Sequence, residues 1–215
     1  MTRTPLTTIE TALPQFPIQA SGPVSLLFLR AGICNFHDAL QYVRTLPYGR
    51  NSDQADLSRV IGEGRGTCSN KHALLASLAD ENSFGGPRGI QLVLGVYRMS
   101  GKNTPGSGPI LETAGLDYVP EAHCYLQWEG ERYDFTTATA APAHFEGDLM
   151  EERLISPLEA TTTKKDYHQE FLRYWLKTQP EITLYFDELW AVREACIEAL
   201  VQYVRQRNAA AEATR

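Results

Sequence analysis

The stretch GTCSNKHALLASLAD, residues 66–80, decides the fold expected of this chain. After a glycine-containing turn, Leu74, Leu75 and Leu78 recur at helical spacing and predict a helix. Cys68 stands where the turn becomes that helix. The N-terminus of a helix carries unpaired N–H groups and the positive end of the helix dipole, and both stabilise a thiolate. A cysteine placed here can have a pKa below its free value of about 8.5, which makes it a candidate nucleophile.

Composition sets the class of protein. With 215 residues, 43% of them hydrophobic, the chain is expected to form one globular domain over residues 1–215, or one core with an appended helical layer. The net charge of −6 gives no reason to expect a nucleic-acid partner. No apolar run approaches the roughly 18 residues of a membrane span, and the N-terminus lacks the apolar core of a secretory signal.

Four cysteines are too few for a disulfide scaffold, so we expect free thiols and a cytoplasmic location. The oligomeric state is left open.

The pattern around the Cys68 helix predicts an α+β fold. Asn35 is placed to cap a helix in which Phe36, Leu40 and Val43 keep helical spacing, and Pro47 ends that helix. The other expected elements are a short helix at 55–61, a buried strand at 90–97, a hairpin at 122–137 and amphipathic helices at 164–178 and 184–207. The last two make up a C-terminal helical layer expected over 150–207.

Residues 99–120 form a long segment that is dense in Gly, Pro, Ser and Thr. A connection of this length inside a compact domain is typical of a lid, a binding loop or a disordered segment. The sequence leaves these three interpretations open.

The hairpin at 122–137 turns at Glu129-Gly130, which makes Trp128 the partner of Glu131. The polar face of the hairpin then carries His123, Tyr125, Gln127, Arg132, Asp134 and Thr136. The other face is nearly all apolar and carries Cys124, Leu126, Trp128, Tyr133 and Phe135. A slip of one residue would mix the two faces, and burial of one face penalises such a slip.

On the polar face, Asp134 becomes the diagonal neighbour of His123, at a backbone separation of roughly 7–8 Å that side chains can bridge. An aspartate in this place can accept the proton of one ring nitrogen and leave the other nitrogen for a thiol. The sequence alone does not bring Cys68 against His123. Packing of the Cys68 helix on the hairpin sheet would do so.

These features together resemble the transglutaminase-like superfamily, within the broader papain-like group of cysteine enzymes. The shared pattern is a Gly-x-Cys at a helix start, an apolar helix, a strand, and a second strand that opens with histidine and has an aspartate on its hairpin partner. The resemblance covers residues 36–137 and implies an α+β core with the cysteine helix against an antiparallel sheet. By position, Cys68 matches the nucleophile, His123 the general base and acid, and Asp134 the orienting carboxylate.

The resemblance implies acyl transfer through a thioester on Cys68, without a cofactor or metal, on a peptide, a protein or a small amide. Water as acceptor would make an amidase or peptidase, whereas an amine would make a cross-linking or transferase enzyme. Hydrolysis is favoured because a small chain has no evident device for excluding water. The N–H of Cys68 would bind the oxyanion. Tyr48 and Asn51 are candidates for a second donor, and His72 is expected to line or border the pocket.

Zinc binding is the rival chemistry at this site. Cys68 and His72 stand four residues apart on one helix face, a spacing that can chelate zinc. His123 and Cys124 are adjacent strand residues that point to opposite faces, so both cannot join the same site. At best this leaves three N or S ligands, with an aspartate as a fourth. The remaining cysteines are expected to be buried and inert: Cys34, Cys124 and Cys196.

Other interpretations also stay open. Cys68 can be a buried structural thiol, since free cysteine is among the most buried residue types. Arg50, Arg65 and Lys71 form either a basic rim near the cysteine or scattered solvated charges. The alternative function is a catalytically silent transglutaminase-like binding module that grips a partner with residues 99–120.

Overall fold

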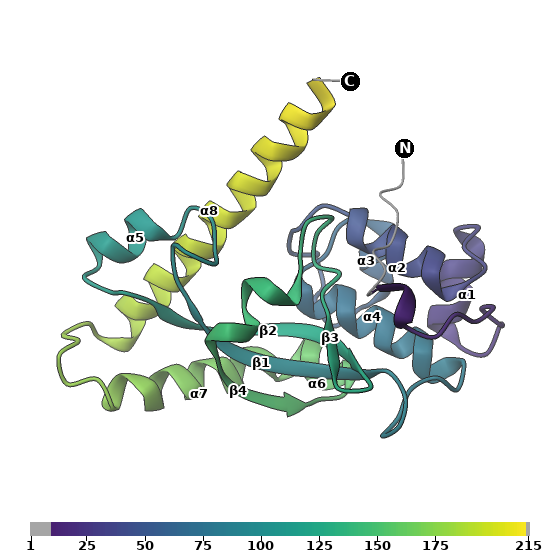
Figure 1. Cartoon of the computed structure of the whole chain (residues 1–215), viewed down its shortest axis with the longest axis horizontal. Coiled ribbons are helices and arrows are strands. Elements are labelled where there is room, and N and C mark those ends of the chain that lie inside the picture. The colour runs from purple at the N-terminus through teal and green to yellow at the C-terminus, as the bar shows by residue number, and fades with distance from the viewer. Residues whose placement is uncertain (1–9, 214–215) are drawn as a thin grey trace. The chain divides into compact units, whose positions relative to one another are not determined.

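The computed structural model describes residues 10–213 of the chain (Figure 1). The expected α+β class is confirmed, because many helices accompany one four-stranded antiparallel sheet. The strand order in this sheet is β3 (Glu131–Tyr133), β2 (Val119–Trp128), β1 (Gln91–Met99) and β4 (Leu149–Leu154).

The chain divides into two compact units, and three of the boundaries between them fall inside β1, β2 and β4. Unit 1 consists of the described residues up to Leu94, His123–Pro142 and Glu152–Thr162. Unit 2 consists of Gly95–Ala122, Ala143–Glu151 and the described residues from Thr163 onward. The single domain expected over 1–215 stays a prediction.

Helix α4 (Cys68–Glu81) is the central helix of unit 1, and its predicted start is confirmed. Thr67 is its N-cap residue, and the side chain of Thr67 accepts the N–H of Asn70. The helix contacts α1 (Pro23–Arg30), α2 (Phe36–Thr45), α3 (Ser58–Gly62) and α6 (Pro157–Thr162). A helix surrounded in this way is buried on nearly all sides rather than along one stripe. Leu74, Leu75 and Leu78 accordingly have no exposed surface.

The N-terminal part of unit 1 packs around the same core. The side chain of Asn35 caps α2 by accepting the N–H of Asp38 at 2.9 Å, as the sequence predicted. Phe36 at the start of α2 is fully buried, and its ring stacks on Phe16 with 4.6 Å between ring centroids. Phe16 also stacks on Phe84 at 4.0 Å. Three successive rings therefore hold the N-terminal segment against the end of α4.

The predicted register of the hairpin is confirmed over three pairs: Leu126 with Tyr133, Gln127 with Arg132, and Trp128 with Glu131. Glu129 and Gly130 both have positive φ, at 51° and 85°, as a two-residue type I′ turn requires. The strand β3 ends at Tyr133, however. The segment with Asp134 and Thr136 therefore lies beyond the strand, and the pairing expected there is wrong.

The layer expected to be helical over 150–207 begins with a strand instead. β4 is half-buried or exposed along its whole length, and its sequence LMEERL has no apolar alternation that would mark a strand. The remaining helices of this region and of 99–120 are α5 (Gly108–Thr113), α7 (Lys164–Lys177) and α8 (Phe186–Ala213). Short 3₁₀ turns cover Glu10–Ala12, Pro142–His144 and Glu146–Asp148.

Unit 2 contains a buried ion pair of its own. The guanidinium of Arg193 in α8 donates to both carboxylate oxygens of Glu121 in β2, at 2.6 and 2.5 Å. His168 in α7 is 2% exposed and donates its Nε2 proton to the carbonyl of Pro120 at 2.9 Å. These contacts fasten the two long helices to β2 within this unit.

None of the helices in residues 10–213 has the length and apolar character needed to cross a membrane.

Candidate active site

Cys68 is the first residue of α4 and is 5% exposed. The chain enters the helix through a short parallel bridge between Tyr48 and Gly66, in which the N–H of Gly49 donates to the carbonyl of Gly66. A Cβ at Gly66 would lie 3.1 Å from the Cγ of Lys71. This contact is tighter than ordinary packing, so a side chain at 66 would press on the helix that carries Cys68.

His123 and Asp134 form the pair that the sequence predicted. Nε2 of His123 lies 2.9 Å from Oδ2 of Asp134, and the two side chains are 14% and 6% exposed. A hydrogen bond to the sulfur of Cys68 is among the interactions that raise the pKa of His123. Because Asp134 occupies Nε2, Nδ1 is the ring nitrogen left for the sulfur. Unit 1 therefore brings Cys68, His123 and Asp134 together.

The charges of Cys68, His123 and Asp134 stabilise one another. Burial alone would lower the pKa of His123, but the carboxylate of Asp134 and the sulfur of Cys68 raise it to about 10. Burial would raise the pKa of Asp134, but the charge and hydrogen bond of His123, with the N–H of Thr136, hold it well below its usual range. An imidazolium between two negative groups is favoured at neutral pH.

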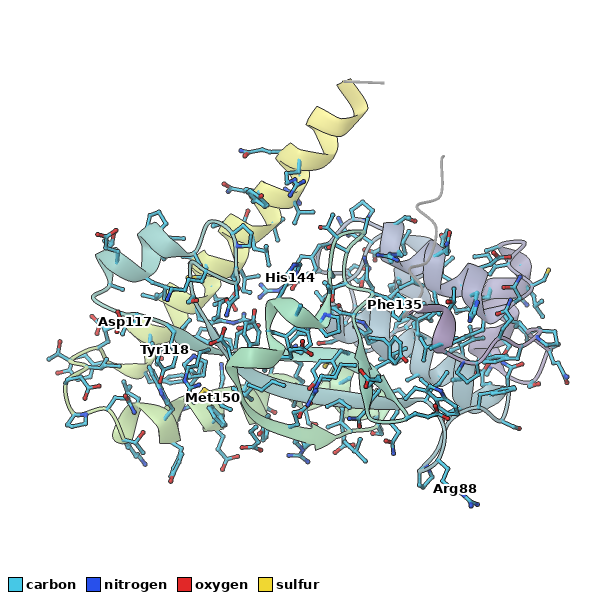
Figure 2. All side chains as sticks on the ribbon, in the orientation of Figure 1. Arg88, Asp117, Tyr118, Phe135, His144 and Met150 are labelled. Atoms are coloured by element: carbon cyan, nitrogen blue, oxygen red, sulfur yellow. The ribbon has the colours of Figure 1, made fainter. Side chains whose placement is uncertain are left out.

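Helix α4, rather than the strand ladder, holds the segment with Asp134. Beyond the end of β3, the N–H of Phe135 donates to Nε2 of His72 at 2.8 Å, and the carbonyl of Thr136 accepts from Nζ of Lys71 at 2.6 Å. Phe135 marks this segment in Figure 2. The carboxylate of Asp134 also accepts the N–H of Thr136 at 2.9 Å. Two neighbouring side chains of α4 therefore position the carboxylate that faces His123.

His72 is fully buried, and both of its ring nitrogens bind backbone groups. Since Nε2 accepts from Phe135, the ring proton lies on Nδ1, which donates to the carbonyl of Cys68 at 2.9 Å. Burial, partly offset by Asp134, lowers the pKa of His72 to about 4 and keeps the ring neutral. Neither nitrogen is left for zinc, an oxyanion or a substrate. This corrects the expectation that His72 lines the pocket.

Lys71 is also fully buried, so it is not part of a basic rim. Its ammonium donates to the carbonyls of Leu46 and Thr136, each at 2.6 Å. Of the other two residues considered for that rim, Arg65 pairs with Glu63 at 3.0 Å and Arg50 is exposed. The sequence did not indicate this burial, because a lysine in an amphipathic pattern is ordinarily assigned to the solvent side.

The side chain of Asn51 does not serve as the second oxyanion donor in this arrangement. The amide nitrogen of Asn51 donates to the carbonyls of Arg59 and Arg65, at 3.2 and 2.9 Å, which uses both of its hydrogens. This corrects the assignment of Asn51 as a donor. Tyr48 is half-buried, its backbone bridges to Gly66, and its role as a donor stays a prediction.

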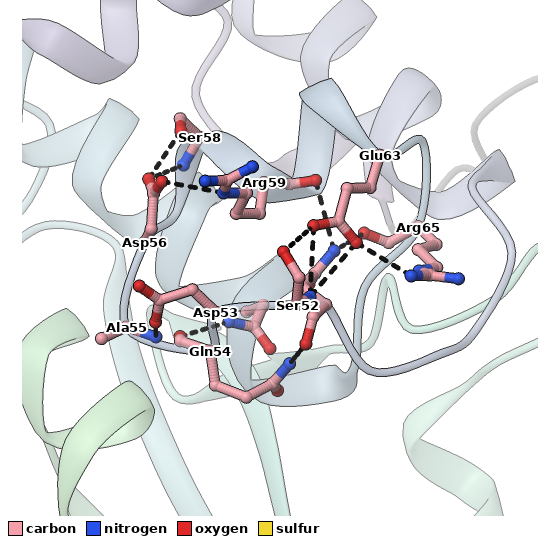
Figure 3. Close-up of polar contacts among 11 residues, drawn as sticks. Ser52, Asp53, Gln54, Ala55, Asp56, Ser58, Arg59, Glu63 and Arg65 are labelled. Atoms are coloured by element: carbon pink, nitrogen blue, oxygen red, sulfur yellow. Dashed lines mark hydrogen bonds and ion pairs between the residues drawn. The ribbon is translucent and has the colours of Figure 1, made fainter.

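The loop before α4 is held by a chain of side-chain amides that sequence reasoning missed. Asn70 donates to the carbonyl of Gln54 at 2.7 Å, and Gln54 donates to the carbonyl of Asn51 at 2.9 Å. Figure 3 shows the further contacts of this loop, including the hydroxyl of Ser52 on the carboxylate of Glu63. The loop is therefore attached to the first turn of α4, two residues after Cys68. A cluster of Asn and Gln near a helix start is the signal that could have indicated it.

The other cysteines separate into two kinds. Cys124 and Cys196 have no exposed surface, as expected, whereas Cys34 is exposed, which corrects the expectation for that residue. Across residues 11–207, whose side chains the structure describes, no group of three or more His, Cys, Asp or Glu side chains is arranged to hold a metal ion.

Comparison of the chain with models of protein families, with curated proteins and with solved structures finds no match.

Proposed function

We propose that this protein is a cysteine-dependent acyl-transfer enzyme of the transglutaminase-like superfamily, which acts through a thioester on Cys68. The observation that carries the proposal is the 2.9 Å contact between His123 and Asp134, together with the hydrogen bond between His123 and the sulfur at the start of α4. A carboxylate, an imidazole and a thiol in this order are the components of an activated cysteine nucleophile.

In the first step, the Cys68 thiolate attacks the carbonyl carbon of an amide or ester, and the carbon–sulfur bond forms as the carbonyl oxygen takes the negative charge. Backbone N–H groups at the positive end of α4 favour that charge. The intermediate then collapses, the bond to the leaving group breaks, and the imidazolium of His123 gives its proton to the leaving nitrogen or oxygen. Asp134 keeps the ring oriented and its charge balanced.

In the second step, His123 accepts a proton from water as the water oxygen attacks the thioester. The carbon–sulfur bond breaks, the thiolate is restored and a carboxylic acid leaves. This makes the protein an amidase or peptidase. An amine in place of water would give a transamidation, and we favour hydrolysis because a small chain has no evident means to exclude water from the thioester.

The family assignment rests on residues 36–137. Unit 1 contributes a cysteine at the start of a buried helix, a histidine on a strand and an aspartate after its hairpin partner. We infer a papain-like core from this arrangement, and we expect a peptide, a protein or a small amide as substrate. A cytoplasmic location stays a prediction.

A catalytically silent binding module is the alternative. Residues 99–120 form a surface hollow of about 310 Å³ around α5, lined by Leu111, Leu116 and several glycines, with the carboxylates of Glu112 and Asp117 beside them. A partner held there would need no activated thiol. The state of Cys68 therefore discriminates between the two functions.

The test is the pH dependence of iodoacetamide alkylation at each cysteine, read by peptide mass spectrometry. At about pH 6, more than two units below the pKa of a free thiol, Cys68 should keep most of its reactivity and should react well ahead of exposed Cys34. His123→Gln should abolish this difference, and His144→Gln, an exposed matched control, should preserve it. A Cys68 profile that falls with pH as the Cys34 profile does would exclude the activated thiolate.

A further inference from the structure

The ammonium of Lys71 is a buried cation at the centre of the proposed site. Lys71 follows Cys68 by three residues, so the two side chains lie on neighbouring positions of one helix face. The residue has no exposed surface, and its Nζ donates to the carbonyls of Leu46 and Thr136, at 2.6 Å each. Its stem also packs against Gly66, where a Cβ would meet the Cγ of Lys71 at 3.1 Å.

Two neutral carbonyls satisfy hydrogen bonds but do not neutralise a charge. A buried ammonium is costly unless anions lie nearby. The negative charges of Asp134 and Cys68 stabilise the ammonium of Lys71 and raise its pKa. With Lys71 and His123 protonated, two cations oppose the thiolate of Cys68 and the carboxylate of Asp134. Without Lys71, the same interior would hold two anions against one imidazolium.

The charged and titratable groups around Lys71 come from several elements. Those nearest in the site are Cys68 and His72 on α4, His123 on β2 and Asp134 beyond β3. Arg44 on α2 is also buried, and its guanidinium donates to the carbonyl of Ala138. The other helices that contact α4 each carry one charged group with a partner or with access to solvent. Arg59 on α3 pairs with Asp56, and Glu159 on α6 accepts a hydrogen bond from Ser156. Arg30 on α1 is exposed. With His72 neutral, Lys71 and His123 are the cations that interact with both Asp134 and Cys68.

We propose that Lys71 is a positioning residue of the Cys68 site: its buried ammonium fastens the segment with Asp134 to α4 and supplies the counter-charge for the thiolate. The role deepens the proposed function and rests on it. A merely structural lysine would hold the two carbonyls without changing how the thiol and the imidazole respond to pH.

The ionisation of Lys71 itself makes this role measurable. Burial lowers the pKa of Lys71, and the charges of Asp134 and Cys68 restore part of it, to about 7. The ammonium is therefore present below neutral pH and is lost above it. An arginine at this position would keep its charge throughout, since a guanidinium does not deprotonate in this range.

The variants are Lys71→Met, Lys71→Arg and Lys102→Met, the last an exposed control. In Lys71→Met, the midpoint of Cys68 alkylation should move to higher pH by about one unit, so the rate at a pH well below both midpoints should fall by roughly tenfold. Lys71→Arg and Lys102→Met should keep the midpoint of the native protein. An unchanged midpoint in folded Lys71→Met would overturn the charge role.

A second readout does not depend on thiol reactivity. The Nε2 proton of His123, bound to Asp134, should give a separate downfield signal in the proton NMR spectrum of the native protein. The signal should exchange faster or vanish in Lys71→Met and persist in Lys71→Arg. If it persists equally in both, Lys71 does not position Asp134, whatever the alkylation result.

Folding of the variants is checked by circular dichroism. If Lys71→Met does not fold, Lys71→Arg decides the question, because only the native protein should show an inflection near pH 7 in the alkylation profile of Cys68. The same inflection in Lys71→Arg would overturn the proposal. The proposed function fails separately, if Cys68 of the native protein responds to pH as Cys34 does.

Discussion

The backbone N–H of Phe135 donates to Nε2 of His72 at 2.8 Å, so the helix that begins with Cys68 directly holds the residue next to Asp134. Cys68 and the segment with Asp134 are thereby coupled through one side chain. Nδ1 of the same ring binds the carbonyl of Cys68 at 2.9 Å. A neutral histidine with both nitrogens engaged is a rigid connection between α4 and the end of the hairpin.

Replacing that connection should destabilise the protein. His72→Leu leaves the N–H of Phe135 without its acceptor, and a buried unsatisfied group costs about 1–3 kcal/mol. We expect the free energy of unfolding, measured by urea denaturation, to fall by at least about 2 kcal/mol. His144→Leu, at an exposed position, should stay within about 0.5 kcal/mol of the native value. Equal stability of both variants would refute the role given to His72.

Removing the charge of Asp134 should change the titration of His123. Asp134→Asn removes the anion that raises the pKa of His123, so this pKa should fall from about 10 toward the ordinary value near 6.5. The imidazole then becomes neutral at pH 7, and turnover of any amide substrate should fall by roughly 10³–10⁴. NMR titration of the imidazole signals measures the first effect. A His123 pKa that stays near 10 would contradict the assignment.

Buried neutral histidines should make stability depend on acidity. Burial lowers the pKa of His72 and His168 to about 4, against about 6.5 when unfolded. Between these values the unfolded state binds the additional protons, so the free energy of unfolding falls as pH drops from about 6.5 to 4. His72→Leu should show a shallower fall in urea denaturation over this window. A slope equal to that of the native protein would rule out burial of a neutral His72.

The ion pair of unit 2 offers a test away from the candidate site. Glu121 and Arg193 are both buried, and Glu121→Gln would remove the buried carboxylate and leave the guanidinium with Glu194, at 2.6 Å, as its carboxylate partner. Loss of one partner of a buried pair costs up to about 3–5 kcal/mol, and Glu194 should offset part of that cost. Thermal unfolding should show the lower stability of Glu121→Gln, whereas the exposed Glu198→Gln should match the native protein. An effect of the same size in both variants would argue against a buried pair.

Local signals predicted the best-defined parts of the fold and the site. The start of α4 at Cys68 and the turn at Glu129-Gly130 depend on nearby residues, through a cap and through positive φ. The register predicted the contact between His123 and Asp134, although β3 ends at Tyr133 and Asp134 reaches His123 from the segment beyond the strand. Parity along a strand fixes which side chains share a face, so the pair could be inferred before any long-range contact was known.

Long-range packing determined what the sequence did not predict. The burial of Lys71 and His72 arises because four helices surround α4, and no periodic pattern records that arrangement. β3 ends early because side chains of α4 bind the next backbone groups in place of a strand. β4 was missed because its charged, exposed sequence carries no alternation.

The most direct test of the central claim is to trap the acyl-enzyme. The protein is mixed with an activated ester, such as a nitrophenyl ester, quenched in acid and digested. The mass of each cysteine-containing peptide is then measured by mass spectrometry. We predict one acyl group on the peptide with Cys68 within the first turnover, and its absence in Cys68→Ser. Acylation of exposed Cys34 at the same rate as Cys68, or of neither residue, would contradict a thioester mechanism at this site.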